Sequence, residues 1–105
     1  SSAASDVYKR QDYIFPDSNS RYLTDEDLSG YSSDQLELAK NEIYARHGRK
    51  FVTQRIADYF NSKSWDKGTV EPETFDADTS VFNEYEVANI QKIADTEGKL
   101  RSEGK

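Results

Sequence analysis

The stretch Asn41-Glu42-Ile43-Tyr44-Ala45-Arg46-His47-Gly48 decides the fold, because it closes the most regular helical pattern in the chain. Upstream of it, Ser32 can cap a helix, and Gln35 completes a capping box three residues later. Apolar residues then recur at helical spacing up to Gly48, and glycine commonly ends helices in the left-handed conformation. These signals together predict a helix over residues 33–47.

A second long helix is predicted near the C-terminus. Asn83 is a good N-cap residue, and Glu86 completes another capping box. The apolar stripe that follows indicates a helix over residues 84–97. Because glycine weakens a helix interior, we expect fraying to begin at Gly98 and the tail, residues 101–105, to be solvated.

Two short helices complete the expected set. Thr24 and Asp27 form a capping box, but a glycine follows soon afterwards, so this helix is expected to be about one turn long. Thr53 can cap another helix that continues to about residue 61. A helix this short depends on packing rather than on intrinsic propensity.

The remaining segments are expected to be non-helical. Residues 1–12 are polar and lack periodicity, which is typical of a disordered linker or an added lead sequence. Tyr13-Ile14-Phe15-Pro16 is expected to be extended, since proline disfavours a helical conformation in the residue before it. Residues 62–79 are interpreted as a loop pinned by Trp65 and Phe75.

The composition fits one small domain. Only 34% of the 105 residues are hydrophobic, the mean hydropathy is -0.96, and a chain of this size buries roughly 60–65% of its unfolded surface. Aromatic residues make up 12% of the chain and supply large buried areas. We therefore predict a monomeric, all-α domain over residues 13–100, with two main helices, two short helices and an extended N-terminal segment.

Several classes of site lack the residues that they need. The chain has no cysteine, which excludes disulfides and thiolate metal ligands, and it lacks an apolar run long enough for a membrane span. A calcium loop opening at Asp76 fails, because its sixth and twelfth positions are Val81 and Val87. We expect no metal, no cofactor and no direct membrane insertion. The sequence lacks a signal peptide, but the linker-like start leaves room for a targeting segment upstream.

The charge is acidic overall but unevenly distributed. The net charge of -6 disfavours nucleic acid as a partner. Residues 40–55 nevertheless carry a local charge of +4, whereas residues 71–86 hold six acids and no base. This asymmetry fits either an anion-binding site or two parts of one fold that attract each other, and the second reading is favoured. The candidate binding residues of the basic region are Arg46, Arg49, Lys50 and Arg55.

Glu42 and Arg46 lie four residues apart, with the acid first, which is the favourable order for an ion pair on a helix. If the pair is exposed it contributes only about 0.3–0.5 kcal/mol, and if it is buried it becomes a junction that ties loops to the helix. This structural reading is favoured. The functional alternative makes Arg46 a fork for a carboxylate or phosphate of a partner.

His47 is the only histidine. Catalysis would require a nucleophile or a second acid–base group beside it, and no sequence signature supplies one. We expect His47 to close the helix and to bond a neighbouring carboxylate or backbone carbonyl, with Asp27 as a plausible partner. A sugar-stacking platform is an alternative reading of several aromatic residues, but these fit core positions more simply. The platform candidates are Tyr22, Tyr31, Tyr44, Tyr59 and Trp65.

The quoted stretch closely resembles the signature of the YARHG domain family, which is named after residues 44–48 as they stand here. Further matching positions are Phe51, Tyr59-Phe60 and Trp65, with residues 21–24 and 27–28 upstream and residues 83–97 downstream. The chain departs from the family after its tryptophan, where Asp66-Lys67-Gly68 replaces an aromatic residue and a proline. The motif residues are Asn41, Glu42, Tyr44, Ala45, Arg46, His47, Gly48 and Trp65.

The resemblance implies a small helical module of bacterial proteins that is extracellular. Such modules are appended to membrane-anchored, lipoprotein or cell-wall-associated chains, and no enzymatic activity is established for them. We therefore expect a non-catalytic cell-surface interaction module that binds an anionic wall polymer, a glycan or another surface protein. The alternatives are a structural spacer without a ligand and, third, a small cell-wall hydrolase or its accessory.

Overall fold

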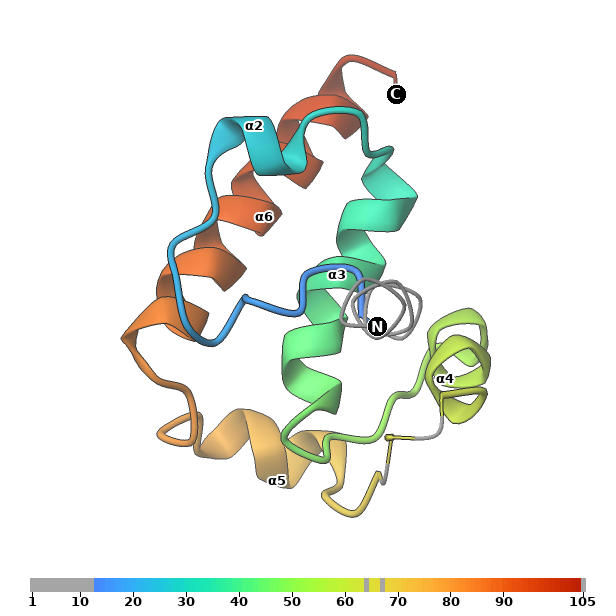
Figure 1. Cartoon of the computed structure of the whole chain (residues 1–105). Coiled ribbons are helices and arrows are strands. Elements are labelled where there is room, and N and C mark those ends of the chain that lie inside the picture. Colours follow the sequence, from blue (N-terminus) through green and yellow to red (C-terminus); the bar gives the residue numbers. More distant parts are fainter. Residues whose placement is uncertain (1–12, 64, 67, 105) are drawn as a thin grey trace, which may run out of the picture.

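The computed structural model describes residues 13–63, 65–66 and 68–104, and this part of the chain is helical (Figure 1). Its only β-type pairing is an isolated bridge between Arg49 and Val70. The all-α prediction is therefore confirmed for the described residues, whereas the linker predicted for residues 1–12 lies outside them. The helices, in chain order, are α2 (Asp25–Leu28), α3 (Ser33–Ala45), α4 (Gln54–Asn61), α5 (Pro72–Ala77) and α6 (Glu84–Ser102).

Helices α3 and α6 pack against each other and form the centre of the domain (Figure 1). Both begin at the capping boxes that the sequence predicts, with Ser32 and Asn83 as N-caps. Ile43 of α3 and Ile93 of α6 are completely buried between them. The same core includes Leu36, Ala39, Phe15, Leu23 and Leu28. Complete burial of one such side chain contributes about 1.5–3 kcal/mol to the free energy of unfolding. The burial of these side chains at the α3–α6 contact therefore dominates the packing.

A second, smaller core holds α4 against the C-terminal half of α3. Ile56 and Phe60 of α4 are buried together with Ala45. The Phe51 ring stacks on the Phe60 ring, with 5.0 Å between the centroids, and the Trp65 ring meets the edge of Phe60 at 6.0 Å. Packing therefore stabilises this two-turn helix, as its length requires.

The N-terminal segment, residues 13–23, crosses the front of the α3–α6 pair before α2 begins (Figure 1). Asn89 of α6 is 1% exposed and holds this segment by its backbone. The Asn89 Oδ1 accepts a hydrogen bond from the Leu23 N–H at 2.8 Å. The Asn89 Nδ2 donates to the carbonyl oxygens of Ser18 and Arg21 at 2.8 and 2.9 Å. A side chain of α6 thus satisfies backbone groups that would otherwise be buried without partners.

The loop predicted for residues 62–79 was wrong in one part, because α5 forms within it. Pro72 stands at the start of α5, where its missing N–H is not needed, and Phe75 is buried. The Phe75 ring contacts the rings of Tyr44 and Phe82, with centroid distances of 5.7 and 5.6 Å. These ring contacts, of which the one to Tyr44 spans a long stretch of sequence, stabilise a helix that is too short to show a periodic pattern.

The two main helices also end at different residues from those predicted. Helix α3 stops at Ala45, and residues 46–48 form a turn in which the Gly48 N–H donates to the Ala45 carbonyl at 2.9 Å. Helix α6 continues through Gly98 to Ser102, so the expected fraying at Gly98 was wrong. The Glu97 carboxylate binds Lys40 of α3 at 3.3 Å and Arg101 at 3.1 Å. These ion pairs support the final turns of α6. No helix among the described residues is both long and apolar enough to cross a membrane.

Candidate functional site

Glu42 is fully buried and uses both carboxylate oxygens to hold the N-terminal segment. Its Oε1 accepts a hydrogen bond from the Ile14 N–H at 2.7 Å, and its Oε2 accepts one from the Phe15 N–H at 3.1 Å. Burial raises the pKa of the Glu42 carboxyl, while these hydrogen bonds and the charge of Arg46 oppose that rise. The expected ion pair of Glu42 with Arg46 is replaced by bonds to the backbone.

Arg46 binds the next part of the same segment. Its Nη1 donates to the Pro16 carbonyl at 3.2 Å and lies 3.4 Å from the Ser18 hydroxyl oxygen. The guanidinium carbon also lies 4.6 Å from the centroid of the Tyr13 ring, which stacks on Trp65. Arg46 thus turns toward the N-terminal segment, and its charge stabilises an aromatic contact.

His47 joins the end of α3 to the start of α6. Its Nε2 lies 2.7 Å from Oε2 of Glu86, which is 4% exposed. The other oxygen of Glu86 accepts the Asn83 N–H at 3.0 Å, so one carboxylate serves both the capping box and the histidine. The prediction of a carboxylate partner is confirmed, but the choice of Asp27 was wrong, because Asp27 pairs with Arg21 at 2.8 Å.

The basic region meets the acidic part of the chain rather than forming one cluster. Arg49 makes two bonds of 3.0 Å to the two carboxylate oxygens of Asp76. Lys50 Nζ lies 2.9 Å from a carboxylate oxygen of Glu71. These contacts join the segment after α3 to α5, as expected if two parts of the fold attract each other. The fourth candidate, Arg55, pairs with Glu37 of α3.

A polar cleft of about 410 Å³ opens beside the motif. Two motif residues, Asn41 and Tyr44, line it together with Lys40, Arg49, Asp76 and Thr79. Its lining combines two cations, a carboxylate, an amide and two hydroxyl groups, so it offers both hydrogen-bond donors and acceptors. Among the predicted binding residues, Arg49 alone lines this cleft.

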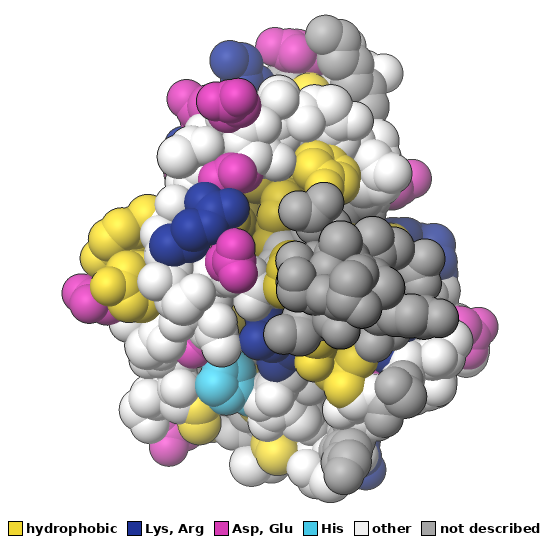
Figure 2. All heavy atoms as spheres, viewed as in Figure 1, with side chains coloured by type: hydrophobic (Ala, Val, Ile, Leu, Met, Phe, Trp, Pro, Cys, Tyr) yellow, Lys and Arg dark blue, Asp and Glu magenta, His cyan; other side chains and the backbone are white. Residues whose placement is uncertain are grey.

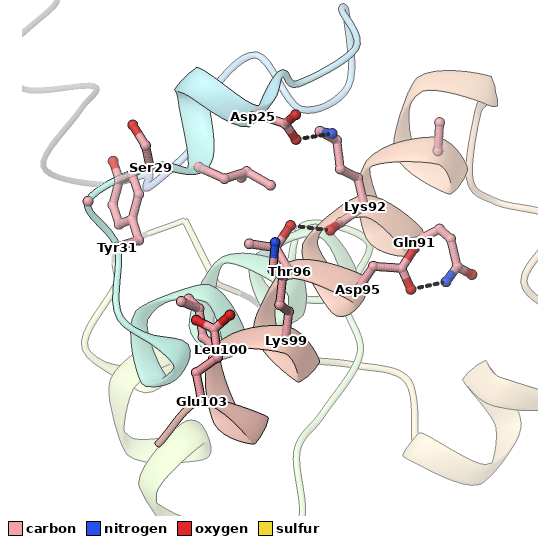
Figure 3. A pocket seen from close by; sticks show the side chains of 13 residues that line it. Asp25, Ser29, Tyr31, Gln91, Lys92, Asp95, Thr96, Lys99, Leu100 and Glu103 are labelled. Atoms are coloured by element: carbon pink, nitrogen blue, oxygen red, sulfur yellow. Dashed lines mark hydrogen bonds and ion pairs between the residues drawn. The ribbon is translucent and has the colours of Figure 1, made fainter. Parts of the chain in front are cut away.

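A larger hollow, about 960 Å³, lies elsewhere, between the α2 region and α6. Figure 3 shows Asp25, Ser29 and Tyr31 on one wall and the side chains of α6 on the other. The Asp25 carboxylate bonds Lys92 Nζ at 2.6 Å across the groove (Figure 3). No motif residue lines this groove, and neither composition nor spacing in the sequence indicated it.

The aromatic residues considered as a sugar platform do not come together. The Tyr44 ring packs against Phe75 and Phe82, whereas the Tyr59 ring packs against Phe60. Tyr22 is 54% exposed, and its ring lies 4.8 Å from that of Tyr85 on the surface. Figure 2 shows apolar side chains scattered over the visible face in several separate groups. A five-member stacking surface is therefore absent from the described residues.

The acidic side chains near Asp76 have local protein partners instead of metal-ligand geometry. Asp76 binds Arg49, which lowers the pKa of the Asp76 carboxyl. Asp78 accepts a hydrogen bond from the Ser80 N–H at 3.1 Å, and hydrogen bonding by the Ser80 side chain and backbone lowers the pKa of Asp78. The described residues contain no group of three His, Cys, Asp or Glu side chains that could hold a metal ion.

A family model for the YARHG domain matches residues 11–98, which is most of the chain. The chain belongs to the YARHG domain family. No curated protein and no solved structure matches it. The geometry gives the YARHG motif a defined set of contacts: Tyr44 packs on α5, Ala45 is buried, and Arg46 and His47 reach the N-terminal segment and α6.

One important residue of this YARHG domain, Asn89, was not among the residues predicted from the sequence. Asn89 lies on the inner face of α6 between Glu86 and Ile93, which are both buried. An amide at an inward position of an amphipathic helix could have indicated a buried backbone anchor. The chain differs from the family pattern at residues 66–68, after Trp65. Asp66 and Gly68 belong to the described residues, and residue 67 lies outside them.

Proposed function

We propose that this YARHG domain is a non-catalytic interaction module of an extracellular or cell-surface bacterial protein. The observation that supports this proposal is that Glu42, Arg46 and His47 of the motif all bind other parts of the domain. Glu42 binds two backbone N–H groups, Arg46 binds a carbonyl, and His47 binds Glu86. The motif then serves the fold, and the surface around it serves recognition. The cellular location rests on the family to which the chain belongs.

The proposed contact surface is the edge formed by Arg49 and Lys50, next to the polar cleft. Their side chains are 18% and 45% exposed, so Lys50 is the more accessible cation. An exposed ion pair such as Lys50–Glu71 contributes about 0.2–1 kcal/mol, which allows an external anion to compete with Glu71 for Lys50. A multiply charged wall polymer or an acidic surface protein has the chemistry to do so. Binding should be weak and should decrease with salt.

A titration with an anionic cell-wall polymer, followed by NMR at low and physiological ionic strength, tests this surface. We expect the amide signals of Arg49 and Lys50 to shift. Lys50→Gln should weaken the binding several-fold, whereas Lys92→Gln, which removes a lysine from an ion pair elsewhere, should leave it unchanged. If the signals of residues 46–55 do not move at a saturating polymer concentration, the proposed surface is wrong.

A structural spacer without a ligand is the second candidate, and one observation favours it. All four predicted binding cations already have partners within the domain: Pro16, Asp76, Glu71 and Glu37. A hydrolase would instead require His47 to face a cleft beside a serine or a carboxylate pair. Instead, the His47 Nε2 lies 2.7 Å from Glu86, which completes the capping box of α6.

The spacer candidate is tested by Glu42→Ala, Arg46→Ala and the double variant. Because both side chains hold the same segment, we expect the single losses of unfolding free energy to be non-additive, with a coupling of about 0.5–3 kcal/mol. The measurement is denaturant unfolding together with the polymer titration. Loss of binding in Arg46→Ala at unchanged stability would contradict the spacer and favour a ligand contact at that residue.

A further inference from the structure

Helix α6 presents a row of alternating charges to the groove between α2 and α6. The row consists of Lys92, Asp95 and Lys99 of α6 and Glu103, the C-cap residue that follows the helix, and all four line the groove (Figure 3). Successive members are three or four residues apart, so they lie on one side of the helix. Their signs, read along the chain, are positive, negative, positive and negative.

This order of charges is complementary to itself when it is reversed. If two copies of α6 lie antiparallel about a two-fold axis near residue 97, Lys92 of one copy faces Glu103 of the other. Asp95 of one copy then faces Lys99 of the other. A two-fold interface uses the same surface on both copies, so each of these opposite-charge contacts occurs twice.

We propose that a second copy of this chain docks in the groove, with the two α6 helices antiparallel, so that the chain forms a weak dimer in place of the monomer expected from its sequence. The groove also offers apolar area from Ala88, Leu100 and Tyr31, which are not fully buried in the single copy. Burial of that area supplies the hydrophobic contribution to binding, and the charge row selects the antiparallel orientation. This inference is independent of the ligand proposed for the basic edge.

The contacts within each copy that compete with this arrangement include two weak ones. Lys92 binds Asp25, whose side chain is 96% exposed, and Asp95 accepts a hydrogen bond from Gln91 at 2.9 Å. Exposed pairs of this kind contribute about 0–1 kcal/mol and can be exchanged for contacts between copies. The net charge of -6 on each copy also opposes association. At physiological ionic strength, screening over about 8 Å weakens that long-range repulsion more than contacts across the interface.

Charge reversal in trans tests the proposal by sedimentation equilibrium of the full chain at physiological ionic strength. We expect the wild-type chain to form dimers with a Kd below about 1 mM. Asp95→Lys places two lysines opposite each other, and Lys99→Glu places two acids opposite each other. Each variant alone should therefore raise the Kd about tenfold or more.

An equimolar mixture of the two variants provides the decisive comparison. In the mixed dimer, Asp95 of the Lys99→Glu chain faces Lys99 of the Asp95→Lys chain. The two substituted residues also face each other with opposite charges, so the mixture should regain wild-type association. Asp58→Lys on α4 makes the same charge change outside the groove and should leave the Kd within about threefold of the wild-type value. Because Asp95 and Lys99 are exposed, far-UV circular dichroism should show that both variants remain folded.

Three results would overturn the proposal. The first is a wild-type chain that remains monomeric at about 1 mM, which would leave the groove to a different occupant or to none. The second is a single charge reversal that does not weaken the dimer. The third is a mixture that associates no better than either variant alone, because the proposal requires the mixture to restore the opposite-charge contacts between copies.

Discussion

At the scale of single residues, two buried polar side chains do work that apolar residues could not do. Glu42 and Asn89 provide acceptors for three backbone N–H groups of the N-terminal segment, and Asn89 also donates to two carbonyls. A buried backbone group that loses its partner costs about 1–3 kcal/mol. The chain path over the α3–α6 pair therefore depends on these two residues as well as on the burial of Phe15 and Leu23.

Asp27 predicts how stability responds to acid. The hydrogen bonds from Arg21 lower the pKa of the Asp27 carboxyl in the folded protein. The contribution of Asp27 to the free energy of unfolding is fully present above the unfolded-state pKa of about 3.9. It is lost as the pH falls through the lower folded-state pKa. Denaturant unfolding at pH values between about 5 and 2 should show a steeper loss of unfolding free energy for the wild type than for Asp27→Asn.

Glu42 acts in the opposite direction and provides the internal comparison. Burial raises the pKa of its carboxyl, so its effect on stability becomes less favourable as the pH rises from the unfolded value of about 4.3 through the folded value. Glu42→Gln should remove this opposing contribution and make the acid-induced loss steeper. Equal pH slopes for the wild type, Asp27→Asn and Glu42→Gln would contradict the assigned roles of both carboxylates.

At the scale of elements, local signals located the helix starts and tertiary contacts decided the rest. The capping boxes at Thr24, Ser32 and Asn83 are all present, because each depends on residues only three positions apart. Helix α5 was not predictable in this way, since the Phe75 ring packs on Tyr44, which is distant in sequence, as well as on Phe82. Likewise, the continuation of α6 past Gly98 depends on the Glu97–Lys40 ion pair with another helix.

Two glycines should respond oppositely to alanine. Gly98 lies within α6, and a Cβ there would meet no atom within 4 Å, so Gly98→Ala should raise the unfolding free energy by about 0.5–1 kcal/mol. Gly48 has φ +92, and its Cβ would lie 3.0 Å from Thr69 Oγ1, so Gly48→Ala should lower it by about 1–3 kcal/mol. Urea unfolding measures both changes, and a loss of stability in Gly98→Ala would contradict the helical assignment there.

At the scale of the whole molecule, the motif joins three parts of the chain. Glu42 and Arg46 hold the N-terminal segment, His47 reaches the start of α6, and Tyr44 packs on α5. Arg49, the residue after the motif, also binds Asp76 of α5. The sequence indicated a junction at this point and a charge attraction between the basic and acidic parts. It did not identify the partners, because Ile14, Glu86 and Asp76 come close to the motif only after folding. The α2–α6 groove was also beyond prediction, since its walls are distant in sequence.

The most direct test of this account is the hydrogen exchange of the Ile14 and Phe15 amides, measured by NMR in the wild type and in Glu42→Ala. Glu37→Ala is the matched control, because Glu37 lies on the same helix but pairs with an arginine side chain. We expect both amides to be protected in the wild type and in the control, and to lose protection in Glu42→Ala while Ile43 and Ile93 remain protected. Unchanged protection of Ile14 and Phe15 in a folded Glu42→Ala variant would contradict the claim that the motif holds the N-terminal segment.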